Sequence, residues 1–244
     1  MRFFRSLFGK RDDPIAQLEK TIGYRFRDRL LLEMALSHRS SLKGTGLQSN
    51  ERLEYLGDAV LGMVVSDFLY RKFNDISEGE LTRKKAILVN ETTLAAVALS
   101  FELGDYLFMS PEEEKSGGRQ KSSIIADAFE ALLGALYLDG GMRPALKIIN
   151  KYLLKDSTEI IEDEKLHNYK GELLEFVQAK GRNIPQYRIK DQIGPDHEKV
   201  FVVEVFIQSE FLGQGGGRTK KEAEQNAARQ ALDRIKNGDY TWQS

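Results

Sequence analysis

Two stretches decide the fold of this chain: Asn50–Gly62, NERLEYLGDAVLG, and Ser123–Leu138, SIIADAFEALLGALYL. Each is typical of a mostly apolar helix, yet each carries acids on the side that we expect to be buried. In the first stretch Glu51, Glu54 and Asp58 have the spacing i, i+3 and i+7, so they line one face of the helix. The acidic positions are therefore part of a repeated pattern rather than scattered surface charge.

The second stretch repeats the pattern, because Asp127 and Glu130 are three residues apart and share a face. An ionised carboxylate that loses water without a partner costs on the order of several kcal/mol. Arg52 is the only basic residue inside either stretch, so local compensation is small. The pattern favours a hard divalent cation such as Mg²⁺ or Mn²⁺, which prefers oxygen ligands. The alternative is that some of these acids are solvated residues or helix caps.

Length and composition limit the other possibilities. The chain has 244 residues, of which 41% are hydrophobic and 30% charged, so we expect one or two globular domains. Cysteine is absent and there are three histidines, which excludes disulfides, thiolate catalysis and Cys-based zinc sites. No apolar run reaches the roughly 20 residues that a membrane-spanning helix needs. We therefore expect a cytoplasmic protein with no membrane contact and no small-molecule organic cofactor.

The first two thirds of the chain predict helices. Pro14–Ile22 and Asp28–Ser37 are typical of short helices, and Ser77–Glu80 fits a capping box that begins another. The polar segment Ser110–Ser123 is predicted to be a loop whose basic residues contact a phosphate backbone. His38 has no supporting Asp in view, so we interpret it as a hydrogen-bonded structural residue rather than a catalytic one.

From Tyr169 onward the pattern changes. Residues 169–180 predict a helix that Gly181 ends. Two runs rich in β-branched and aromatic residues predict strands, a third strand is expected after them, and a long Ala-rich run predicts a final helix. The expected strands are Tyr187–Ile193, Val200–Gln208 and Glu210–Gly215, and the expected helix is Thr219–Ile235. The order is α-β-β-β-α. Residues 167–237 hold 12 Lys+Arg and 10 Asp+Glu, a net charge of +2, against −1 for the whole chain.

At this point the residues resemble a known family. NERLEYLGDAVL is similar to the signature of bacterial ribonuclease III, and IADAFEALLGALYLDGG resembles the second acidic helix of that family. The segment from about Asn168 to Lys236 resembles a double-stranded-RNA-binding domain. The resemblance implies an all-α ribonuclease III endonuclease domain followed by an α+β RNA-binding domain. The domains expected are an N-terminal extension over 1–13, the catalytic domain over 14–155, a linker over 156–167, the RNA-binding domain over 168–237 and a tail over 238–244.

The resemblance also implies chemistry. Members of the family are endoribonucleases that cut double-stranded RNA and leave staggered ends with 5′-phosphate and 3′-hydroxyl groups. They process ribosomal precursors and other structured RNAs. Residues expected to hold Mg²⁺, with Mn²⁺ able to substitute, are Glu54, Asp58, Asp127 and Glu130. Asp58 and Glu130 are expected to be catalytic. Glu51 and Glu78 are expected to have secondary roles in the active site.

Partners are implied as well. Tyr55 matches the aromatic residue through which the family forms a homodimer; the alternative for an isolated tyrosine is a core position. In the RNA-binding domain the resemblance assigns RNA contacts to Glu172, His197, Lys220 and Lys221. Lys220 and Lys221 begin a helix, where backbone N–H groups also attract phosphate.

Two other functions compete with a double-stranded-RNA nuclease. A catalytically silent double-stranded-RNA-binding scaffold with the same fold is disfavoured, since all four ligand positions hold acids. A metal phosphohydrolase for small molecules gives no role to the C-terminal domain. Cleavage of duplex against single-stranded RNA with and without metal distinguishes all three.

Overall fold

The computed structural model describes residues 14–42, 48–163, 168–195 and 199–238, and the chain divides into two compact units at residues 166 and 167. The expected extension over 1–13 and the tail from 239 lie outside the described residues, as does His197. Each unit has a core of its own. The predicted order, a helical unit followed by an α-β-β-β-α unit, is confirmed.

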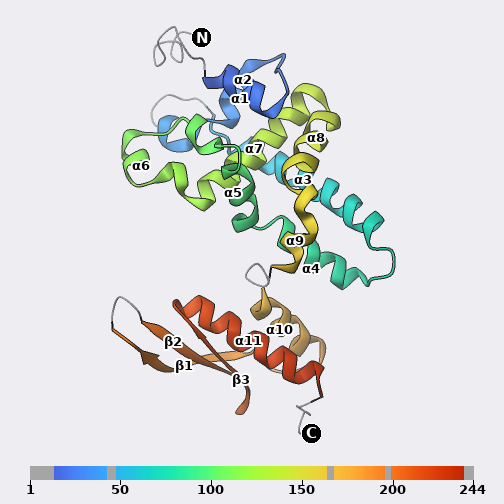
Figure 1. Ribbon diagram of the computed structural model, residues 1–244, viewed down its shortest axis with the longest axis vertical. Coiled ribbons are helices and arrows are strands. Elements are labelled where there is room, and N and C mark those ends of the chain that lie inside the picture. Colours follow the sequence, from blue (N-terminus) through green and yellow to red (C-terminus); the bar gives the residue numbers. More distant parts are fainter. Residues whose placement is uncertain (1–13, 43–47, 164–167, 196–198, 239–244) are drawn as a thin grey trace. The chain divides into compact units, whose positions relative to one another are not determined.

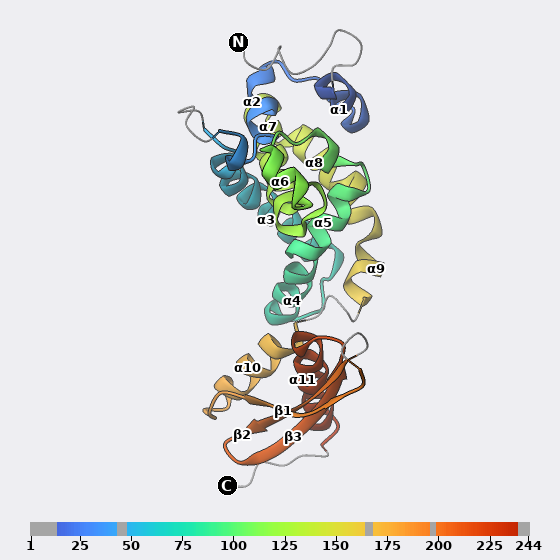
Figure 2. The ribbon, with the colours of Figure 1, turned by 90° about the vertical axis from the view of Figure 1, so that its left-hand side faces the viewer.

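The first unit is helical (Figure 1). Two long helices, α3 and α7, lie side by side at its centre, and the other helices pack around them (Figures 1 and 2). The helices are α1 (Pro14–Ile22), α2 (Arg29–Ala35), α3 (Glu51–Lys72), α4 (Glu78–Leu88), α5 (Glu91–Leu99), α6 (Pro111–Lys115), α7 (Ser122–Gly140), α8 (Met142–Tyr152) and α9 (Ser157–Glu162). Short 3₁₀ turns are η2 (Arg39–Leu42), η3 (Leu103–Tyr106), η4 (Gly118–Gln120) and η5 (Leu154–Asp156).

Local sequence explains where several helices begin. Asp28 caps α2 by accepting a hydrogen bond from the Leu30 backbone N–H. Ser77 and Glu80 form the predicted capping box at the start of α4. Helix α7 ends at Gly140, and the next residue, Gly141, has a φ of 74°, a backbone conformation that favours glycine.

The central helices meet at glycines. A Cβ atom on Gly57 of α3 would lie 1.7 Å from the Glu130 carbonyl oxygen of α7. One on Gly134 of α7 would lie 2.2 Å from the Leu53 carbonyl oxygen of α3. The two backbones are therefore in direct contact, and the acids beside these glycines are brought together.

The sequence-based prediction of a loop over residues 110–123 is wrong. Within it lie α6 and η4. Ser110 caps α6 by accepting from the Glu113 N–H, Pro111 occupies the first turn, and three glutamates follow. Ser-Pro followed by acids is a helix-start signal, and it outweighs the polar composition of the segment.

The second unit is one antiparallel sheet, in the order β1-β2-β3, covered by two helices. Its elements are α10 (Tyr169–Ala179), β1 (Gln186–Ile193), β2 (Val200–Ile207), β3 (Glu210–Gly217) and α11 (Lys220–Lys236). Alternate residues of β3 are the glycines Gly213, Gly215 and Gly217, and a Cβ on any of them would lie within 2.8 Å of α11 atoms. Helix α11 faces them with alanines, so helix and strand pack closely.

Candidate active site and RNA-binding surface

Three carboxylates converge where α3 and α7 cross. Glu54 comes from α3, and Asp127 and Glu130 come from α7. One oxygen from each lies within 4.8 Å of the others, and all three side chains are partly buried. The distance is short enough for one small cation to contact all three oxygens. Among the described residues no lysine or arginine forms a salt bridge with any of these three acids.

Burial and mutual repulsion raise the pKa values of these three acids. Burial, followed by the charges of Asp58, Glu54 and Asp127, raises the pKa of Glu130 to about 8. Burial and neighbouring acids also raise the pKa of Glu54 and of Asp127. The site thus keeps at least one proton near neutral pH unless a cation replaces it. Oxygen donors alone, with this repulsion, fit a hard divalent cation.

The remaining predicted active-site acids lie around this cluster. Asp58 is exposed and outside the group of three, but its charge is the largest electrostatic contribution to the raised pKa of Glu130. Glu51 is exposed in the first turn of α3, and its charge raises the pKa of Glu54. Glu78, in the first turn of α4, accepts a hydrogen bond from the Thr82 hydroxyl at 2.9 Å and is not among the clustered acids. Roles for these three stay predictions.

Sequence reasoning did not select two charged residues that act on the cluster. Glu91, at the start of α5, is the largest cause, after burial, of the raised pKa of Asp127. Arg39 in η2 has the opposite effect on that pKa. Neither residue lies on the two acidic helices, so no spacing in the sequence connects them to the site.

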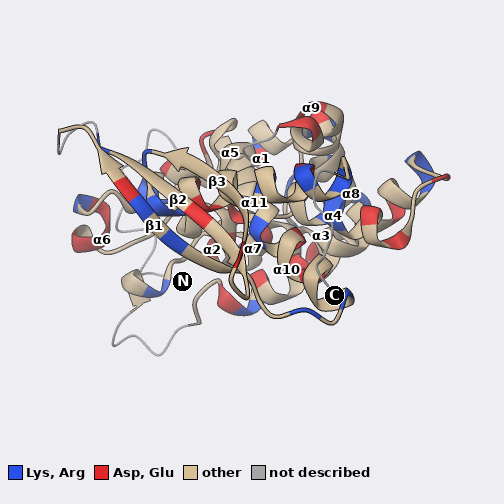
Figure 3. Cartoon of the chain, turned by 90° about the horizontal axis from the view of Figure 1, so that it is seen from below, with Lys and Arg blue, Asp and Glu red and all other residues tan. Residues whose placement is uncertain are grey.

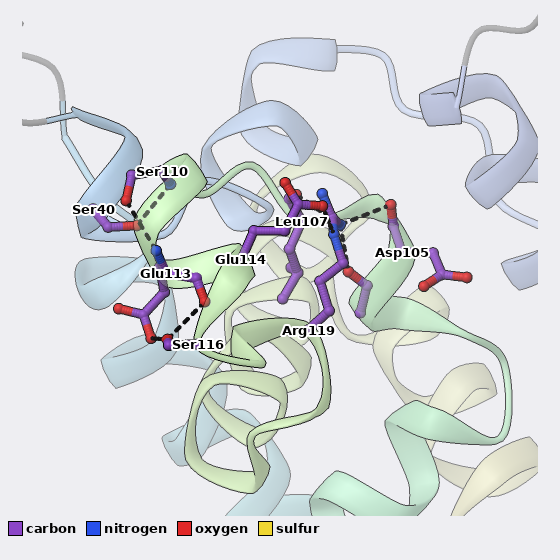
Figure 4. A network of polar contacts seen from close by, with 9 residues as sticks. Ser40, Asp105, Leu107, Ser110, Glu113, Glu114, Ser116 and Arg119 are labelled. Carbon is purple, nitrogen blue, oxygen red and sulfur yellow. Dashed lines mark hydrogen bonds and ion pairs between the residues drawn. The ribbon is translucent and has the colours of Figure 1, made fainter.

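Arg119 has a structural role instead of the predicted phosphate contact (Figure 4). Its Nε donates to Glu114 at 2.6 Å, and its Nη1 donates to the carbonyl oxygens of Gly104, Asp105 and Leu107 at 2.8, 3.1 and 3.1 Å. The guanidinium therefore joins η3 to the segment that leads into α7.

His38 is hydrogen-bonded, as expected. Its Nδ1 lies 2.8 Å from the Ser40 hydroxyl oxygen, and burial lowers the pKa of the ring. The imidazole is neutral at physiological pH, which fits a structural residue.

Tyr55 is not a core residue: 82% of its surface is exposed. Met63 and Tyr70 are also exposed on α3, and their spacing places all three on one side of that helix. Large apolar side chains aligned on an exposed helix face are typical of an interface. Gly57, by contrast, faces α7 of the same chain, so it serves packing within the unit rather than this exposed face.

In the second unit Lys220 and Lys221 begin α11 and are exposed. Thr219 caps the helix by accepting from the Glu222 N–H, and among the described residues no acid forms a salt bridge with either lysine. Glu172, the other described candidate for RNA contact, pairs with Lys236 at 3.1 Å, and its side chain is 15% exposed. Basic and acidic residues also mix on β1 and β2 (Figure 3), where Lys190 pairs with Glu204 at 2.7 Å.

Comparisons with known proteins identify both units. A family described as Ribonuclease-III-like matches residues 28–157, and one described as Double-stranded RNA binding motif matches residues 169–235. The chain is 47% identical to a ribonuclease 3 of Pelotomaculum thermopropionicum over 223 residues, which cover 90% of this chain and 92% of the relative. This chain belongs to the ribonuclease III family.

Further relatives agree. A ribonuclease 3 of Geobacter sulfurreducens is 44% identical and covers 91% of this chain and 90% of its own length. A solved nuclease domain of the ribonuclease III of Campylobacter jejuni is 44% identical, with a TM-score of 0.55, and covers 58% of this chain and 96% of that domain. As a ribonuclease III, the protein is an endoribonuclease with a double-stranded-RNA-binding domain. No described helix is both long enough and apolar enough to cross a membrane.

Proposed function

We propose that this ribonuclease III hydrolyses double-stranded RNA with Mg²⁺, or Mn²⁺ in its place, held by Glu54, Asp58, Asp127 and Glu130. The observation that carries the proposal is the convergence of three partly buried carboxylates within 4.8 Å. When bound, such a cation stabilises charge on phosphate oxygens and lowers the pKa of the attacking water.

The residues of the chain have separate tasks in this reaction. Glu54 and Asp127 supply oxygen ligands from different helices, so the contact between α3 and α7 fixes the distance between them. Glu130 exchanges its proton for the cation, since its pKa of about 8 keeps it protonated otherwise. Water attacks phosphorus while the bond to the 3′-oxygen breaks, which leaves 5′-phosphate and 3′-hydroxyl ends.

Cutting both strands requires two such sites, and we infer a homodimer formed through the exposed face of α3 around Tyr55. The Campylobacter jejuni nuclease domain is described as having structural flexibility in a region involved in dimer formation. The exposed Tyr55, Met63 and Tyr70 support a corresponding interface here. Two sites related by symmetry produce staggered ends.

The RNA-binding domain supplies affinity for the duplex. Lys220 and Lys221 offer positive charge, with no salt bridge to any acid of the described chain, next to the backbone N–H groups that begin α11. Glu172 and His197 are proposed to contact the minor groove, and Glu172 must exchange Lys236 for RNA to do so. Processing of ribosomal precursors and other structured RNAs, and a cytoplasmic location, are part of the same proposal.

The test compares a perfect RNA duplex with single-stranded RNA of the same sequence, with Mg²⁺, with Mn²⁺ and with chelator. We expect the wild type to cut only the duplex and only with metal. Glu130→Gln removes a ligand charge without removing volume, so it is expected to bind the duplex and not cut it. Glu159→Gln, an exposed acid on α9, is the matched control and should cut normally. Binding without cutting by the wild type under every condition indicates a silent scaffold.

A further inference from the structure

Two segments far apart in the sequence are joined beside the acidic cluster. The His38 N–H donates to the Phe108 carbonyl at 2.9 Å, and the Phe108 N–H donates to the Leu36 carbonyl at 2.8 Å. The Ser40 hydroxyl oxygen contacts His38 Nδ1 at 2.8 Å and accepts from the Ser110 N–H at 3.0 Å (Figure 4). The segment that holds Arg39 is therefore fixed to the segment that leads into α6 and α7.

One cation extends from each segment. Arg39 lies in η2, and Lys121 is the residue immediately before α7. Arg39 Nη1 lies 3.8 Å from a Glu51 carboxylate oxygen, and Lys121 Nζ lies 3.8 Å from a Glu113 oxygen. Both side chains are largely exposed, 75% for Arg39 and 58% for Lys121. Ion pairs this long and this exposed contribute little, so both cations are available to a stronger anion.

These cations lie in the same neighbourhood as the acids. The pKa of the His38 ring responds to both Arg39 and Lys121, and also to Glu113 and Asp127. The geometry agrees: Arg39 pairs with Glu51, which lies one turn before Glu54 on α3. Lys121 directly precedes α7, six residues before Asp127 on the same helix. Both cations therefore lie near the proposed metal ligands.

An anionic substrate needs such cations here. Four carboxylates repel RNA, and one divalent cation neutralises only two of them. Arg119 cannot help, because its guanidinium already bonds Glu114 and three carbonyl oxygens. Arg39 and Lys121 have no such internal hydrogen bonds within the part of the chain that is described.

We propose that Arg39 and Lys121 form a phosphate-binding site for the RNA strand that is cut, holding phosphates next to the one at the metal. Without RNA, Arg39 pairs with Glu51 and Lys121 pairs with Glu113. When the duplex binds, RNA phosphates replace these two carboxylates. The inference rests on the proposed function, because it concerns the same active site.

The experiment measures duplex binding as a function of salt concentration, and steady-state cleavage with Mg²⁺, for Arg39→Gln, Lys121→Gln and the double variant. Each lost phosphate contact should reduce the slope of log affinity against log salt by about 1. Because the contacts exist before and during cleavage, KM should rise severalfold for each substitution while kcat stays near the wild-type value. Binding is measured in the Glu130→Gln background, where cutting is not expected.

Two controls make the result specific. Arg71→Gln removes an arginine of equal exposure, 76%, that pairs with Asp67 on the distal part of α3, and should leave slope and KM unchanged. Arg39→Lys keeps the charge and should restore most of the salt slope. Thermal unfolding of all variants should match the wild type, since only exposed ion pairs are lost.

Two results would overturn the inference: a double variant with wild-type slope and KM, or an Arg71→Gln variant that loses as much as Arg39→Gln. In both cases the metal-site proposal stands as long as the wild type cuts. If the wild type fails to cut duplex with Mg²⁺ and with Mn²⁺, the proposed function itself fails.

Discussion

The backbone carbonyl of Glu130 lies where a side chain at position 57 would begin. A Cβ on Gly57 would be 1.7 Å from that oxygen and 3.0 Å from the Gly134 nitrogen. Glu130 is also one of the three clustered acids. The same point of contact therefore serves the packing of α3 on α7 and the placement of a proposed metal ligand.

Gly57→Ala should be strongly destabilising. The added methyl group meets backbone that can move only if the central helices separate, so we expect a loss of about 3 kcal/mol in the free energy of unfolding. Metal-dependent cleavage should fall together with stability, because the acids move apart. Urea unfolding of the metal-free protein measures the first effect.

Gly62→Ala is the matched control on the same helix. Its Cβ would lie 3.3 Å from the flexible end of Lys85, which can move away. We expect it to be neutral or to stabilise by about 0.5–1 kcal/mol, because alanine favours helix. Equal destabilisation by the two substitutions would show that the backbone contact at Gly57 is not the cause.

Stability without metal should depend on pH through Glu130. Its pKa is about 8 in the folded protein, against an ordinary value of 4.5 for glutamate, so the folded state holds the proton more tightly. The metal-free protein should then lose stability as pH rises from about 4.5 to about 8. Glu130→Gln cannot ionise, so its advantage over the wild type should be small near pH 5 and larger near pH 8.5. Urea unfolding with chelator at the two pH values is the measurement, and an advantage that does not change with pH contradicts the assignment.

Tyr55→Ala should break the proposed dimer and leave the single chain stable. Since Tyr55 is 82% exposed, its removal should change the stability of the subunit by less than about 0.5 kcal/mol. Sedimentation should show half the wild-type mass at low micromolar concentration. Ile184→Ala, which truncates an exposed apolar side chain in the second unit, should keep the wild-type mass. A Tyr55→Ala protein of unchanged mass would place the interface elsewhere.

Tyr187→Phe should stabilise the RNA-binding domain. The Tyr187 hydroxyl is buried and is the one buried side-chain polar atom without a hydrogen-bond partner among the described residues. An unsatisfied buried hydroxyl costs about 1–3 kcal/mol, and phenylalanine removes it while keeping the ring beneath Lys170 Nζ, 4.5 Å from the centroid. Thermal unfolding should show a higher midpoint for the transition of this domain. An unchanged or lower midpoint would indicate that the hydroxyl has a partner in solution.

The elements that sequence predicted well are those with local causes. The acid at Asp28 and the Ser77–Glu80 pair specify helix starts within a few residues, and both are confirmed. Strand β2 is a β-branched and aromatic run long enough to be recognised. The shared face of the acids within each of α3 and α7 followed from their spacing. The combination of the two sets came from the family resemblance, and the contact between the helices from the structure.

What sequence missed depends on contacts between distant residues. Arg119 lies in a segment whose basic residues were expected to contact phosphate, but its guanidinium donates to the carbonyl oxygens of Gly104 and Asp105 in η3 and of Leu107 just after it. The sequence did not single out Arg39, because its place near Glu51 depends on the hydrogen bonds of His38 and Ser40 with residues 108 and 110. Gly57 lies on a helix that also has an exposed face, and only the structure shows that Gly57 is on the face that contacts α7.

The glycine contact between α3 and α7 also affects how the protein can change over time. The separation of the two acidic helices is set by main-chain atoms, which every residue shares, rather than by the sizes of neighbouring core side chains. Repacking the surrounding leucines and isoleucines, in a laboratory redesign or during divergence, can therefore alter stability while the spacing of Glu54 from Asp127 and Glu130 stays the same. Positions 57 and 134 are the exceptions, and tolerance to substitution in this unit should be lowest there.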